Sequence, residues 1–125
     1  MHTALRVIIA SIGVLTVAIG LAFLLVPAGP AAQFFISPIG SQGMATLRAD
    51  FPGFFIGAGV FALIGAWRAD PAPLAVPLLM LALALLGRCV SLVMDGMGPD
   101  AIAPMVAEAV MIAVLLAGRS VFARQ

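Results

Sequence analysis

The chain has 125 residues, of which 64% are hydrophobic and 9% are charged, and its formal net charge is +1. Soluble domains average about 45 to 50% apolar and about 25% charged residues, so this composition indicates an integral membrane protein. The small net charge argues against nucleic-acid binding, no run of Lys or Arg marks an anionic-lipid patch, and the single cysteine, Cys89, excludes an intrachain disulfide.

The first predicted span covers residues 5–26, which carry no charge after Arg6. About 20 helical residues cross a bilayer, and the apolar part of a signal peptide is usually only about 7 to 15 residues long. We therefore expect a retained membrane anchor rather than a signal peptide. Pro27 and Pro30 then end the helix, and residues 27–43 predict a loop in which 31–36 forms a short interfacial helix with Phe34 and Phe35 in the acyl boundary.

Three further spans are predicted at about 44–67, 73–94 and 101–116. Prolines lie in or near the first turns of these spans, where a missing N–H costs least, at Pro52, Pro73, Pro77 and Pro104. The short links between them predict antiparallel neighbours. The expected fold is all-α, a transmembrane up-down four-helix bundle that forms a single domain over residues 1–125.

The arginines predict the orientation, because cytoplasmic flanks and short loops accumulate Lys and Arg. Four arginines fall on one side of the four-span arrangement: Arg6, Arg68, Arg119 and Arg124. We expect that side, with both termini, to be cytoplasmic. The opposite side, with the 27–43 loop and the 95–100 turn, is then periplasmic in a Gram-negative host.

Several charged residues fall inside or at the edges of these spans, where a charge costs at least about 2.5 to 3.5 kcal/mol. At about 1.5 Å of rise per residue, Arg88 and Glu108 each lie about 10 Å inward from the 95–100 turn, so we expect them to meet. Helical phase directs further polar side chains toward the same place. The predicted charge or ligand-binding cluster is Arg48, Asp50, Arg88, Ser91, Asp95 and Glu108.

Two interpretations of this cluster are open. In the first, the pairs Arg88–Glu108 and Arg48–Asp50 only hold helices together. In the second, the surplus carboxylate, Asp95 or Glu108, is a protonatable or ligand-contacting group. We favour the second, because fixing helices needs one pair. Glycines on the first and second spans are expected to let helices approach closely, at Gly13, Gly20, Gly53 and Gly57.

Two sequence blocks carry a family resemblance: RADFPGFFIG at 48–57 and GRCVSLVMDG at 87–96, followed by Glu108. Together they resemble a bacterial domain-of-unknown-function family of small four-helix membrane proteins that is loosely similar to DoxX-like proteins. Pro52 stands where a glycine is expected. The resemblance implies a multi-pass protein of the bacterial inner (plasma) membrane and brings no activity or cofactor with it.

Three classes of function remain. Binding of a small amphiphilic or lipid-soluble molecule between the helices ranks first, with Arg88 anchoring an anionic or carbonyl group. A non-catalytic accessory subunit ranks second, and a small enzyme or a proton-coupled dimeric transporter ranks third. Catalytic residues are unknown, and HExxH, GxSxG and GxGxxG motifs are absent from the sequence. We therefore expect that the protein is not an enzyme and that it holds neither a metal nor a cofactor. Whether it forms a homodimer stays open.

Overall fold

Apolar runs separated by proline- and glycine-rich links fold into five helices in the computed structural model, which describes residues 1–124. The helices are α1 (His2–Leu25), α2 (Ala28–Gln33), α3 (Gly40–Arg68), α4 (Ala75–Met94) and α5 (Ile102–Phe122). No strand occurs in the described residues. Four of the helices, all but α2, are long and apolar enough to cross a membrane.

The bounds of α1 and α4 lie within three residues of the predicted spans. In the predicted 27–43 loop, the short helix is α2, three residues earlier than expected. The aromatic residue Phe35 follows it with φ 58°, in the left-handed region. This backbone conformation turns the chain from α2 toward the start of α3.

The second predicted span differs most from the structure. Helix α3 has 29 residues and begins at Gly40 rather than near 44, after Ile39 in an extended conformation. Pro52 therefore lies inside the helix, buried, and not in its first turns. Because proline has no N–H, the carbonyl of Arg48 receives no hydrogen bond from position 52.

Helix α5 extends to Phe122, past the predicted end at 116. Its last turns are held by packing on the beginning of α1. A Cβ built on Gly118 would clash with Ile9, and the ring of Phe122 lies edge-on to His2 at 5.3 Å. Tertiary contacts with α1 therefore keep residues 117–122 helical, although the glycine and polar residues in this segment did not predict a helix.

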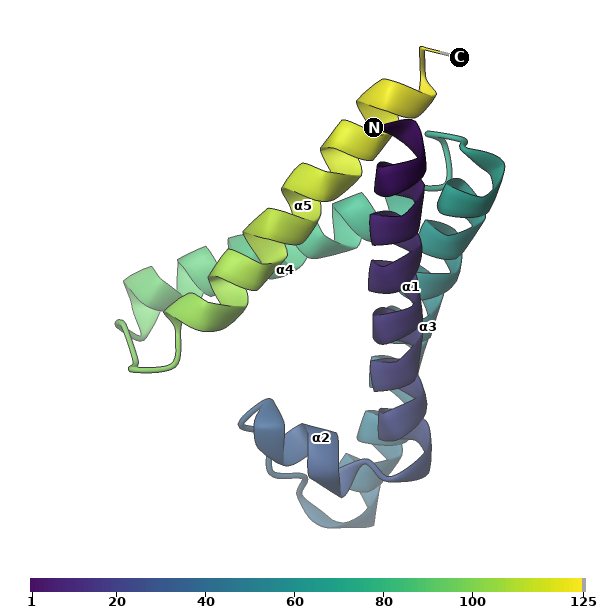
Figure 1. The fold of residues 1–125 in the computed structure, drawn as a ribbon. Coiled ribbons are helices and arrows are strands. Elements are labelled where there is room, and N and C mark those ends of the chain that lie inside the picture. The colour runs from purple at the N-terminus through teal and green to yellow at the C-terminus, as the bar shows by residue number, and fades with distance from the viewer. Residues whose placement is uncertain (125) are drawn as a thin grey trace.

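The four long helices form two pairs (Figure 1). Helices α1 and α3 lie side by side and antiparallel, with residue 13 beside residue 59 and residue 20 beside residue 56. Helices α4 and α5 form the second pair, which leans away from the first. The pairs meet at the end that holds both termini, here called the proximal end, and diverge toward the distal end, where α2 and the α4–α5 turn lie.

A hydrophobic core joins the two pairs at the proximal end. Its buried residues come from α1, α3, α5 and the start of α4: Ile9, Ala62, Ala66, Leu74, Leu115 and Phe122. A second core lies at the distal end of α1 and α3. There Phe23 is fully buried and stacks on Phe51 at 4.7 Å, while Phe34 meets it edge-on at 5.5 Å. This aromatic group fixes the end of α2 against the first pair.

Close packing between α1 and α3 depends on glycines, but not on all of those expected. A Cβ on Gly13 would lie 3.0 Å from the carbonyl oxygen of Gly59, and one on Gly20 would lie 3.0 Å from the backbone nitrogen of Ile56. By contrast, a Cβ on Gly53 or Gly57 would meet no atom within 4 Å. The packing role expected for Gly53 and Gly57 is therefore wrong, and Gly59, on the opposite face of α3, lies at the contact.

Candidate functional site

The charged pair at the centre of the site joins the facing helices α4 and α5. Nε of Arg88 donates a hydrogen bond to Oε1 of Glu108 at 2.8 Å. The Glu108 side chain is 11% exposed and that of Arg88 is 37% exposed. The prediction that these two residues meet is confirmed, and they form the one ion pair in the described part of the chain.

This pair leaves hydrogen-bonding capacity unused on both sides. Oε2 of Glu108 is buried and has no hydrogen-bond partner within residues 1–124. Within the same residues the guanidinium of Arg88 is engaged through Nε alone, although an arginine–carboxylate pair can form two parallel bonds. The Nη nitrogens of Arg88 are therefore available to a further acceptor.

A second hydrogen bond lies one turn further toward the distal end of α4. Oγ of Ser91 donates to Oδ2 of Asp95 at 2.7 Å, and both residues are exposed. Ser91 is three residues from Arg88 and so shares its helix face. Asp95 is thus held by a hydroxyl rather than by an arginine.

The structure does not bring Arg48 and Asp50 into this group. Both are exposed on α3, and neither makes an ion pair or a side-chain hydrogen bond with the residues that the structure describes. Residues two apart on a helix point in different directions, so an Arg48–Asp50 pair is geometrically unfavourable. In addition, the distal half of α3 packs on α1 and diverges from α4 and α5 (Figure 1). The expected Arg48–Asp50 pair and the convergence of three polar stripes are wrong.

Beside Arg88 lies a cleft of about 650 Å³, here called the distal cleft. It runs between the end of α2 and the distal ends of α4 and α5. Its apolar walls include Phe34, Phe35, Leu92, Pro104 and Met105, and its polar side chains are Gln33, Arg88, Ser91 and Asp100. A mostly apolar cavity with a few polar groups is the usual form of a small-molecule site.

The sequence did not place Gln33, Phe34 and Phe35 in this site, because nothing in their pattern shows which helix pair α2 approaches. The aromatic contacts of Phe34 with Phe23 and Phe55 provide that information only once the chain is folded. Among the described residues, no group of three or more His, Cys, Asp or Glu side chains is arranged to hold a metal ion.

The four apolar helices and the ion pair between two of them define a class, that of multi-pass helical membrane proteins. Comparison with known proteins does not identify a family for this chain. No family model, no curated protein and no solved structure matches this chain. The chemistry of the site is therefore the basis for a functional assignment.

Proposed function

We propose that this protein binds a small amphiphilic or lipid-soluble molecule in the distal cleft. The observation that carries the proposal is the single hydrogen bond of Arg88, a residue that lines a mostly apolar cleft of about 650 Å³ and whose Nη nitrogens have no acceptor within residues 1–124. A cation in such a place favours a ligand with a carbonyl or anionic group at one end and an apolar body at the other.

Each residue then has a distinct role. Arg88 donates to the polar group of the ligand. Glu108 accepts the hydrogen bond from Nε of Arg88 and so fixes the guanidinium. Phe34 and Phe35, which directly follow α2, contact the apolar body of the ligand. Ser91, whose hydroxyl donates to Asp95, is one of the polar residues that line the cleft.

The proposed arrangement in the membrane is an up-down four-helix bundle with both termini in the cytoplasm. Arg6, Arg68, Arg119 and Arg124 support this orientation, since they fall at the ends of helices that meet at the proximal end. The distal cleft then opens toward the outer leaflet. The sequence resemblance to small DoxX-like proteins favours the bacterial inner membrane as the location.

The test is photolabelling of the protein in membrane vesicles with a diazirine-bearing analogue of palmitic acid, followed by peptide mapping. Labelling is expected to concentrate on 33–35 and 88–105, and Arg88→Gln should reduce it several-fold. Phe35→Ala should do the same, whereas Val93→Ala, at an exposed position of α4 outside the cleft, should leave it unchanged. Equal labelling along all lipid-facing surfaces would contradict the proposal.

A second candidate is a non-catalytic subunit of a membrane assembly, either a homodimer or a complex with another protein. The observation in its favour is the uncovered surface at Gly53 and Gly57, where a Cβ would meet nothing within 4 Å. In that case cysteine cross-linking at position 53 or 57 would capture a partner chain in vesicles, while the distal cleft would show no selective photolabelling.

A further inference from the structure

A second cleft, at the proximal end, lies far from Arg88 and has a different chemistry. It has a volume of about 630 Å³ and runs between the first turns of α1 and the last turns of α3. Two arginines, Arg6 and Arg68, contribute to its lining although they are 62 residues apart in the sequence, and no acidic residue does. The fold therefore assembles a cationic site that no run of basic residues indicates.

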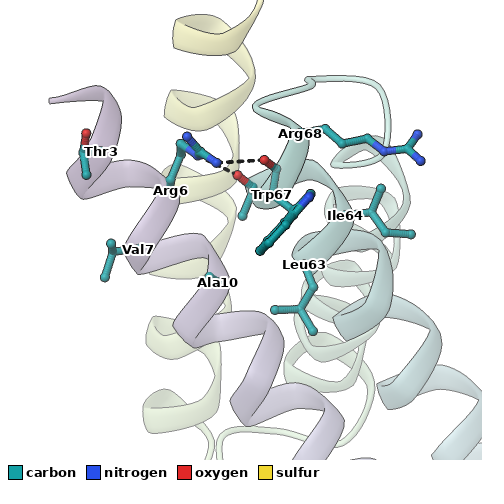
Figure 2. Close-up of a pocket in the computed structure, with 9 residues that line it drawn as sticks. Thr3, Arg6, Val7, Ala10, Leu63, Ile64, Trp67 and Arg68 are labelled. Atoms are coloured by element: carbon teal, nitrogen blue, oxygen red, sulfur yellow. Dashed lines mark hydrogen bonds between the residues drawn. The ribbon is translucent and has the colours of Figure 1, made fainter.

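Arg6 is held in place at this cleft by the end of α3. Its Nε donates to the carbonyl of Ala66 and its Nη2 to the carbonyl of Trp67, both at 2.8 Å (Figure 2). These carbonyls belong to the last turn of the helix, which carries a partial negative charge that a cation stabilises. The two bonds fix the position of the guanidinium, and its Nη1 has no hydrogen-bond partner within residues 1–124.

The rest of the cleft separates into a polar rim and an apolar wall. The hydroxyl of Thr3 and the indole of Trp67 lie near the rim, and Trp67 is 83% exposed. Val7, Ala10 and Leu63 line the groove further along α1 and α3. Figure 2 shows the indole between Arg6 and Leu63, with the Arg68 guanidinium extending away on the far side.

The nearest acidic residue in sequence makes no ion pair with these arginines. Asp70, two residues beyond Arg68, accepts a hydrogen bond from the backbone nitrogen of Ala72 at 2.9 Å and so belongs to the α3–α4 turn. It is not part of the cleft lining. The lining of the cleft thus includes two arginines and no acidic residue beside an apolar groove.

We propose that the proximal cleft is a binding site for an anionic phospholipid. The phosphate group would lie at Arg6 and Thr3, and one acyl chain would follow the groove along Val7, Ala10 and Leu63. Arg68, whose guanidinium lies on the other side of Trp67, would add a second positive charge at longer range. Charge complementarity supports an anionic rather than a zwitterionic lipid. The exposed tryptophan is of the kind that lies at the level of lipid headgroups. This proposal does not depend on the function of the distal cleft.

Trp67 is the only tryptophan in the chain, so its fluorescence reports directly on the lipid in this cleft. The protein is reconstituted into vesicles of phosphatidylcholine with 20 mol% phosphatidylglycerol, made in two forms that differ only in which lipid carries brominated chains. Equal numbers of brominated molecules are used in both. Quenching by brominated phosphatidylglycerol is expected to exceed quenching by brominated phosphatidylcholine several-fold.

The decisive variant is Arg68→Gln, because Arg68 is exposed and its side chain makes no hydrogen bond within the described residues. It should lower the preference for phosphatidylglycerol several-fold, because it removes one of the two arginines that line the cleft. Arg124→Gln is the matched control, since it removes the same charge from an exposed position outside the cleft and should keep the preference. Equal quenching by the two lipids, or an equal loss of preference in Arg124→Gln, would overturn the proposal.

Discussion

Arg88 and Glu108 share a single hydrogen bond across the α4–α5 interface, and the second oxygen of the carboxylate is buried with no hydrogen-bond partner among the described residues. A buried carboxylate with one bond is less stable than one that is fully satisfied. The pair is therefore poorly explained as a device for stability alone. Arg88 also lines the distal cleft, and its Nη nitrogens make no hydrogen bond within residues 1–124.

The first prediction concerns this pair. Arg88→Ala should lower the free energy of unfolding by about 3 to 5 kcal/mol, because it leaves the Glu108 carboxylate buried without its partner. Adding Glu108→Gln should recover part of that loss, since the buried group is then neutral. A double-mutant cycle measured by denaturant unfolding in detergent micelles tests the coupling. Strictly additive effects of the two changes would show that the pair contributes nothing.

The second prediction compares two glycines on α3 that lie two residues apart. Gly59→Ala should destabilise the protein strongly, because its Cβ would lie 2.8 Å from the carbonyl oxygen of Gly13 and 2.9 Å from the backbone nitrogen of Val17. Gly57→Ala should be neutral or should stabilise the helix by up to about 1 kcal/mol, because nothing lies within 4 Å of that position. Thermal unfolding in the same detergent measures both. Equal effects would mean that α1 and α3 do not pack as described.

The third prediction concerns the end of α3. Ala69 has φ 52° and ψ 41°, a left-handed conformation that glycine adopts at little cost. Ala69→Gly should therefore raise the free energy of unfolding by about 1 kcal/mol. Ala69→Val, which is β-branched, should lower it. A decrease in stability for the glycine variant would show that the methyl group contributes more than the backbone strain costs.

The fourth prediction concerns the aromatic group that fixes α2. Phe23→Ala should lower stability by about 3 kcal/mol, because the side chain is fully buried between Phe34, Phe51 and Phe55. It should also speed hydrogen exchange in residues 31–36, since α2 loses its support. Leu24→Ala, at a 42% exposed neighbouring position, is the control and should change neither. Unchanged exchange in α2 after Phe23→Ala would contradict the proposed anchoring of the cleft wall.

The number and approximate limits of the spans could be predicted because crossing a bilayer requires a long apolar run, which is a one-dimensional property of the sequence. The meeting of Arg88 and Glu108 could also be predicted, since two antiparallel helices joined by a short turn place residues equally far from the turn at the same depth.

The rotation of each helix could not be predicted in the same way. In a membrane both the lipid-facing and the protein-facing sides of a helix are apolar, so hydropathy does not mark the contact face. Gly53 and Gly57 are small residues one helical turn apart, but the face that packs carries a longer series of small residues, namely Ala58, Gly59, Ala62, Gly65 and Ala66. That series of small residues is visible in the sequence and marks the face of α3 that packs against other helices. The position of α2 depends on aromatic contacts between distant segments, and no comparable pattern in the sequence indicates them.

The length of α3 has a mechanical consequence. Its 29 residues extend about 44 Å, whereas the hydrocarbon core of a bilayer is about 30 Å thick. The helix must therefore tilt or extend its first turns, which include Arg48, into the headgroups. Because the two helix pairs are joined by the core at the proximal end, a change in tilt of α3 would alter how far the distal ends stand apart. Membranes of different thickness would then set different widths for the space that faces Arg88.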